Sequence, residues 1–393
     1  MPPSFDYWLA RLAGFTRPRR AALAQSPARP SQPGISVVIP SRNGRTLLAT
    51  HLPGILRDLE ALPAEIIVSD NGSDDGTAAW LRAEHPQVVV DVCERPLSFA
   101  RAVNRGIARA RYSHVCLLNN DMEVAPGFFR ALLRPFDDVR DLFCSTAQIH
   151  FPPGVRREET GKAVMAQDNP TDFPLRCDEP LTGEDGTPVL YGSGGCSLYD
   201  TAKLRALGAI DEAYEPAYVE DLDIGYRAWQ RAWPSVYVAD AQVEHRHRAT
   251  TSRYYSEQQL EEVLEVNYLK FLVRAVADRA VFAGLWRQAL DRLRLLENRP
   301  AAQRALTQAA QIARTGGPRE KVAFPEREFL ALTNGCAASF PGAGEGHTLQ
   351  CVERLEPPSS ADLDKHREVM LVAAARDSDA FRGATRFATH KCA

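Results

Sequence analysis

Short apolar runs alternate with helix-like segments between residues 34 and 118, and this alternation constrains the fold more than any other feature. The apolar runs and the segments with helical spacing of apolar residues cover, in chain order, 35–39, 46–60, 65–69, 77–83, 88–92, 99–110 and 114–118. A strand buried on both faces has a continuous apolar run, and short strand–helix connections favour parallel pairing. The pattern therefore predicts an α/β fold, with a mostly parallel sheet flanked by helices.

Polar clusters follow three of the predicted strands at the point where each strand ends. They are Pro40-Ser-Arg-Asn43, Asp70-Asn-Gly-Ser-Asp-Asp-Gly76 and Asn119-Asn-Asp121. Ligands of open parallel sheets bind outside the carboxyl ends of the strands. We therefore expect these three clusters to form one ligand site.

Composition excludes several classes of function. The chain has 393 residues, a net charge of −3 and eight cysteines, none of them in a C-x-x-C pair. These values argue against nucleic-acid binding over the whole surface, against a zinc knuckle and against a disulfide framework. The first ten residues lack the pattern of a secretory signal, and charges interrupt the apolar stretch 271–285, so we expect a cytoplasmic protein that does not span the membrane.

The second and third clusters each suit a ligand and also suit an ordinary turn. Asp70 can accept hydrogen bonds from a base or ribose, but the same segment is also typical of a strand–helix turn with Ser73 or Asp75 as the N-cap. Carboxylate and amide oxygens around Asp121 suit Mg²⁺ or Mn²⁺, which can bridge a diphosphate. A turn capped by Asn and Asp is the competing interpretation for that cluster.

Two later segments add acid, base and phosphate chemistry. Glu220, Asp221 and Asp223 lie at the start of a predicted helix, where capping needs fewer than three acids, so we interpret one of them as a general base. His245-Arg-His-Arg248 suits a metal or a phosphate. No P-loop and no G-x-G-x-x-G after the first strand compete with this interpretation.

In this order, the motifs resemble inverting glycosyltransferases of family 2, of the bacterial rhamnosyltransferase-like sort. The resemblance covers about residues 34–270. Two positions depart from the family pattern: Arg42 replaces an aromatic residue, and Ser98 replaces a glycine. The segments that carry the resemblance are 37–44, 69–77, 99–106, 117–127, 208–212, 218–223 and 243–251.

The resemblance implies a GT-A fold, a nucleotide-diphosphate sugar donor (UDP- or dTDP-sugar) and a Mn²⁺ or Mg²⁺ cofactor. It assigns Asp121 and His245 to the metal, and Asp221, with Glu220 beside it, to catalysis. The residues expected to bind the donor are Pro40, Arg42, Asn43, Asp70, Asn71, Ser73, Asn104, Asn119, Asn120, Gly194 and Gly195.

Composition along the chain predicts three parts. Residues 1–33 form an N-terminal extension and linker, 34–255 the GT-A domain, and 256–393 a helical C-terminal extension. A proline-rich stretch within the domain, 151–190, is interpreted as a flap.

The predicted function is sugar transfer to a hydroxyl of a glycan, lipid-linked glycan or protein acceptor, in bacterial cell-surface glycan or glycoconjugate synthesis. Nucleotidyl transfer is a rival, although the first loop lacks the Gly- and Lys-rich signature expected of it. A second rival is a peripheral membrane or scaffold protein with a vestigial sugar-nucleotide site, in which the apolar side of residues 275–298 contacts the inner face of the membrane. An ordinary packing helix explains 275–298 equally well.

Overall fold

A computed structural model describes residues 3–16, 21–22, 32–139, 141–150, 185–245, 254–319 and 322–333. Most of the expected flap, residues 151–184, lies outside the described residues, as do Arg246, His247 and Arg248 of the histidine motif and the C-terminal segment 334–393.

The first half of the sheet is parallel, as the sequence predicts. Its strands have the order β4-β3-β2-β5, and each neighbouring pair is parallel. The strand bounds are Gln32–Ser41 for β2, Ala64–Asn71 for β3, Val89–Cys93 for β4 and Tyr112–Leu118 for β5. Helices α2 (Arg45–Leu59), α3 (Thr77–Glu84) and α4 (Phe99–Arg109) connect them, which confirms the predicted alternation.

Antiparallel strands complete the sheet, and the sequence analysis did not anticipate their antiparallel pairing. Strand β9 (Cys196–Asp200) lies between β5 and β7 (Cys144–His150) and is antiparallel to both. Strand β10 (Ser235–His245) is parallel to β7 and antiparallel to the short β6 (Met122–Val124). The remaining elements of this half are α5 (Phe128–Asp138), β8 (Pro188–Val189), α6 (Thr201–Ala206) and α7 (Glu220–Gln230).

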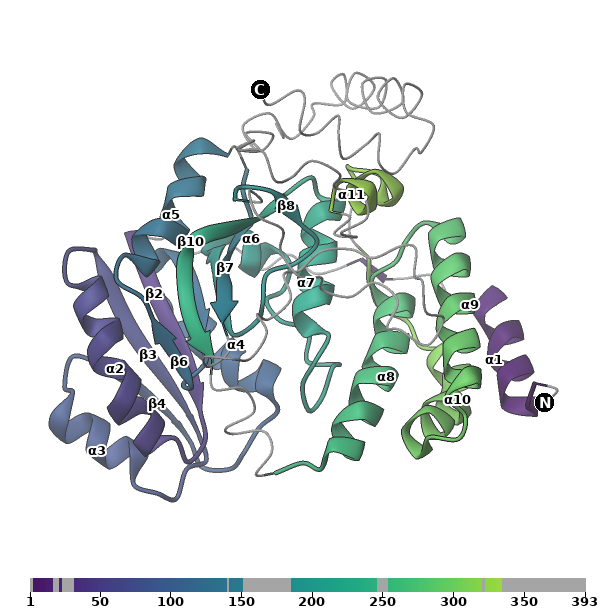
Figure 1. Cartoon of the computed structure of the whole chain (residues 1–393), viewed down its shortest axis with the longest axis horizontal. Helices are drawn as coiled ribbons and strands as arrows, with labels where there is room; N and C mark the ends of the chain where they lie inside the picture. The colour runs from purple at the N-terminus through teal and green to yellow at the C-terminus, as the bar shows by residue number, and fades with distance from the viewer. Residues whose placement is uncertain are drawn as a thin grey trace.

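The C-terminal helices share a buried core with α7 and with the N-terminal helix. They are α8 (Glu257–Arg274), α9 (Arg279–Leu295), α10 (Pro300–Ile312) and α11 (Glu326–Leu332). Helix α1 (Phe5–Phe15) packs on α9 and α10 at the outer edge of this group (Figure 1). Two-residue strands β1 (Ala21–Ala22) and β11 (Pro318–Arg319) also pair the two ends of the described chain.

The proposed membrane face of residues 275–298 is wrong, because its apolar side chains are buried. Trp286 is 3% exposed, and its indole N–H donates to Ala10 O at 3.1 Å. Packing against α1, α8 and α10 leaves this apolar face no access to a lipid surface. The other buried members of the face are Phe282, Leu285, Leu290 and Leu293.

Two helical glycines test how closely α4 packs on the sheet. A Cβ on Gly106 would clash with the Val38 side chain of β2, whereas a Cβ on Gly54 of α2 would meet no atom within 4 Å. We expect Gly106→Ala to lower the free energy of unfolding by about 1–3 kcal/mol through overpacking. Gly54→Ala is the matched control, and we expect it to raise that free energy by about 0.5–1 kcal/mol because alanine favours the helix.

Urea denaturation of both variants and the parent chain measures the two effects. Equal changes in the free energy of unfolding for Gly106→Ala and Gly54→Ala would contradict the close approach of α4 to β2.

Candidate active site

The carboxyl ends of β2, β3 and β5 meet at one edge of the sheet and are tied together by side chains. Parallel pairing places Ser41, next to Pro40, opposite Asp70. The Asn120 side chain donates to Ser41 Oγ at 2.9 Å. The backbone N–H of Asn43 donates to Ser73 Oγ at 2.8 Å, and Asn43 accepts from the N–H of Asp74. The three polar clusters predicted to converge therefore lie together.

Asp70 combines deep burial with an unsatisfied oxygen. The residue is 2% exposed, and its Oδ1 has no hydrogen-bond partner among the described residues. Leaving a buried carboxylate oxygen unpaired is unfavourable, so this atom is suited to accept a hydrogen bond from a ligand. Asn71, the next residue, bonds instead to the backbone N–H and C=O of Leu97 and fixes the loop before α4.

The pairing of β6 with β10 brings together the two residues expected to hold a metal. His245 is opposite Met122 in the register, and its Nε2 lies 3.5 Å from Asp121 Oδ1. Both residues are buried, at 7% and 5% exposure. No group of three or more His, Cys, Asp or Glu suited to a metal occurs in the described part of the chain. One carboxylate and one imidazole fit a Mn²⁺ or Mg²⁺ whose other ligands are phosphate oxygens and water.

A glycine turn links the end of β5 to the acids of α7. The N–H of Asn119 donates to Gly195 O at 2.8 Å, and the N–H of Gly194 donates to Asp221 Oδ2 at 3.2 Å. A Cβ on Gly195 would lie 2.4 Å from the Asn119 side-chain nitrogen, so a larger residue here would force that amide to move. Gly194 and Gly195 therefore connect Asp221 to the edge of the sheet that carries Asp121.

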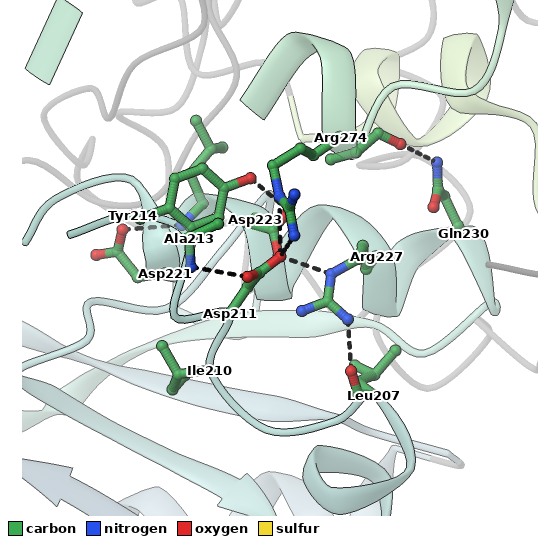
Figure 2. Close-up of polar contacts among 12 residues, drawn as sticks. Leu207, Ile210, Asp211, Ala213, Tyr214, Asp221, Asp223, Arg227, Gln230 and Arg274 are labelled. Atoms are coloured by element: carbon green, nitrogen blue, oxygen red, sulfur yellow. Dashed lines mark hydrogen bonds and ion pairs between the residues drawn. The ribbon is translucent and has the colours of Figure 1, made fainter. Parts of the chain in front are cut away.

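The three acids at the start of α7 have different surroundings. Asp223 is fully buried and accepts from Tyr214 Oη at 2.8 Å and from Arg227 Nε at 2.6 Å (Figure 2). These bonds indicate a structural role for Asp223. Figure 2 shows Asp221 pointing away from this ion pair, and Asp221 is only partly buried.

Glu220 is buried beside Asp221, and its Oε2 has no hydrogen-bond partner within the described segments. Burial first, and then the charge of Asp221, raise the pKa of Glu220 well above its usual value. A carboxyl group of this kind favours the protonated form next to an acid that is accessible to ligand.

The loop before α7 is strained and is held by a buried asparagine. Tyr218 and Val219 have φ of 73° and 79°, in the left-handed region that non-glycine residues rarely occupy. Asn267 of α8 is fully buried and donates to the carbonyls of Tyr214, Ala217 and Tyr218 at 2.9–3.2 Å. Sequence analysis missed Asn267; its only signal is a polar residue within the apolar spacing of Leu260, Leu264 and Phe271.

Two other residues predicted to bind the sugar donor have contacts that the sequence did not indicate. The Arg42 guanidinium lies over the Tyr254 ring, 3.8 Å from its centroid, a cation–π contact beside the loop that follows β2. The Asn104 side chain bonds to the backbone N–H and C=O of Ile210 and to Glu212. Both polar atoms of this amide are thereby used to join α4 to the loop that precedes α7.

No helix in the described ranges is both long enough and apolar enough to cross a bilayer.

Comparison with known proteins finds matches to one family of glycosyltransferases. The family model "Glycosyl transferase family 2" matches residues 36–208. A Mycobacterium tuberculosis N-acetylglucosaminyl-diphospho-decaprenol L-rhamnosyltransferase is 29% identical over 234 residues, which cover 52% of this chain and 74% of the relative.

Solved structures are similar in fold. S. aureus TarS 1–349 in complex with UDP-GlcNAc gives a TM-score of 0.50 at 15% identity, over 88% of this chain and 92% of that chain. GalNAc-T7 with UDP, GalNAc and Mn²⁺ also gives 0.50, at 19% identity, over 63% of this chain and 49% of that chain, so the match spans about half of GalNAc-T7. Residues 36–208 therefore match glycosyltransferase family 2, and the fold of the described residues is similar to that of GT-A glycosyltransferases.

Proposed function

We propose that this protein is a metal-dependent, inverting glycosyltransferase that moves a sugar from a UDP- or dTDP-sugar to a hydroxyl acceptor. The observation that carries the proposal is the convergence of Asp121, His245 and Asp221 around the carboxyl ends of the strands. The rhamnosyltransferase relative is named for a diphospho-decaprenol substrate, which supports a lipid-linked glycan as the acceptor class.

The nucleoside binds where β2 and β3 end. Asp70 uses its unpaired Oδ1 to accept a hydrogen bond from the base or ribose. Arg42 lies on the adjacent loop. Its Nε is buried and has no hydrogen-bond partner among the described residues, so this N–H is suited to donate to an oxygen of the nucleotide sugar. Asn43 and Ser73 hold the two loops in place.

Asp121 and His245 would hold the divalent ion. When bound, Mn²⁺ or Mg²⁺ supplies positive charge that stabilises the negative charge of the leaving diphosphate. The backbone contacts of Asn119 and Gly195 fix the segment that carries Asp121.

Asp221 is the general base. It takes the proton of the acceptor hydroxyl, whose oxygen forms the new bond to the anomeric carbon as the bond to the diphosphate breaks. A single displacement from the opposite face inverts the configuration and needs no carboxylate nucleophile. Burial and the charge of Asp221 raise the pKa of Glu220, which favours a single negative charge on this pair, carried by Asp221.

We also propose three parts, an N-terminal extension at 1–33, a catalytic domain at 34–255 that performs the transfer, and a helical extension at 256–393. A scaffold protein with a vestigial sugar-nucleotide site is the alternative function. Nucleotide binding and turnover distinguish the two.

The first prediction concerns the donor and metal site. Calorimetric titration of the full chain with UDP and with dTDP, with and without Mn²⁺, is expected to show binding of one nucleotide that Mn²⁺ strengthens. Asp121→Ala removes one of two protein ligands, so we expect its Mn²⁺-dependent gain in affinity to fall by about 10–100-fold. An exposed carboxylate provides the control, Asp240→Asn, which should bind as the parent does. Absence of nucleotide binding under every condition would favour the vestigial-site alternative.

The second prediction concerns the base. Asp221→Asn keeps the shape of the side chain but cannot accept the proton, so we expect kcat to fall at least about 100-fold. Binding of the nucleotide with Mn²⁺ should stay within about twofold of the parent, a difference of roughly 0.4 kcal/mol. Sugar transfer from the nucleotide found by titration, measured as nucleotide release, gives kcat. Turnover of Asp221→Asn close to that of the parent would refute the assignment.

The third prediction follows from the raised pKa of Glu220. Above the ordinary pKa of glutamate, the unfolded chain loses this proton before the folded chain does, so the stability contributed by protonated Glu220 is lost as pH rises toward the folded pKa. Glu220→Gln stays neutral, and we expect its stability relative to the parent to increase with pH above about 4.5. Urea denaturation between pH 5 and 8 measures the difference, with the exposed Glu60→Gln as control. A constant difference across this range would contradict a raised pKa.

A further inference from the structure

Helix α1 has two apolar faces, and the described residues cover only one of them. Tyr7, Ala10 and Ala13 are buried against α9 and α10. On the other side, large apolar residues recur at intervals of three and four and so form one stripe of the helix. Their exposed fractions are 79% for Phe5, 51% for Trp8, 65% for Leu12 and 79% for Phe15.

The stripe is the main concentration of exposed large apolar side chains in the described residues. In the part of the chain that the structure describes, only four other large apolar side chains are exposed: Val89, Val92, Leu295 and Val322. The stripe has two phenylalanines and a tryptophan, side chains that bury readily at the boundary between lipid headgroups and acyl chains. Helix α1 lies on the outer edge of the helical group, on the side remote from the sheet (Figure 1).

Charge around the stripe is positive. Helices α1, α9 and α10 together carry six arginines and two aspartates. Two of the arginines, Arg292 and Arg304, pair with Glu265 and Glu262 of α8, which leaves Arg11, Arg279, Arg287 and Arg294. Both aspartates are engaged within the group: Asp291 accepts from Tyr7 Oη, and Asp6 accepts from Thr307. Arg11 lies on α1 itself, with its guanidinium 5.9 Å from the Trp8 ring centroid. The whole chain is acidic, so this local excess of arginine complements an anionic surface.

From these observations we propose that α1 docks the protein on an anionic lipid membrane, with Phe5, Trp8, Leu12 and Phe15 inserted at the interface. Arg11 of α1 and the arginines of α9 that are not paired with α8 (Arg279, Arg287 and Arg294) attract the lipid phosphates. This surface replaces the one expected at 275–298, whose apolar residues are buried beneath α1. The proposal does not depend on the glycosyltransferase chemistry.

Vesicle flotation of the full chain tests the proposal. The protein should float with phosphatidylglycerol vesicles, float less with phosphatidylcholine vesicles, and detach as salt screens the arginines. Replacing Phe5, Trp8, Leu12 and Phe15 together by serine should reduce the partition coefficient at least about tenfold, because the apolar insertion is lost. These side chains are exposed, so the quadruple variant should keep the unfolding midpoint and the nucleotide affinity of the parent. Val92→Ser, on the distant edge strand β4, is the matched control and should float as the parent does.

Tryptophan emission provides an independent readout. Trp8 should shift to shorter wavelength when phosphatidylglycerol vesicles are added. Trp8→Phe should still float but lose that shift, since phenylalanine keeps the apolar contact and removes the probe. Failure of the parent to float with phosphatidylglycerol, or unchanged flotation of the quadruple variant, would overturn the proposal. So would a dimer that the quadruple variant converts to a monomer without any vesicle binding, because a second copy would then cover the stripe.

Discussion

Parallel pairing of β2 with both β3 and β5 is the constraint on which the rest of the site depends. Because the three strands run in the same direction, their carboxyl ends meet at one edge, and the polar segments after them come into contact. The bond from Asn120 to Ser41 and the bond from Asn43 to Ser73 join those segments directly. Reversing any of these strands would move its polar segment to the opposite edge and separate these partners.

Local patterns in the sequence predicted the parallel half of the sheet, because each of its strands is a continuous apolar run followed by a turn signal. The antiparallel pairing in the other half of the sheet was not predicted, for a physical reason. Strands β7 and β9 contain serine, threonine, glutamine and histidine, and their pairing joins segments far apart in the chain. The predicted membrane contact of residues 275–298 was wrong for another reason. An amphipathic pattern predicts a helix with one apolar face but does not say what covers that face. Here α1, from the other end of the chain, packs against it.

Within the site, the sequence identified the acids but could not distinguish their surroundings. Glu220, Asp221 and Asp223 lie within four residues, yet Asp223 is fixed by Arg227 and Tyr214, Glu220 is buried without a partner among the described residues, and Asp221 contacts the glycine turn. Helical geometry separates them, because successive residues on a helix point in directions about 100° apart. Asn267 was missed for a different reason: its partners are backbone carbonyls of a loop some fifty residues earlier in the chain.

The strained loop before α7 connects the helical extension to the chemistry. Positive φ at Tyr218 and Val219 is unfavourable by about 1–3 kcal/mol per residue and persists only where surrounding contacts enforce it. Asn267 supplies those contacts from α8, and α8 packs in turn against α9 and α10. The C-terminal helices therefore do more than extend the sheet domain, since one of them holds the backbone that positions Glu220 and Asp221. A helical group that carries α1 on its outer edge and Asn267 on its inner side joins the proposed membrane-docking surface to the loop beside the proposed base.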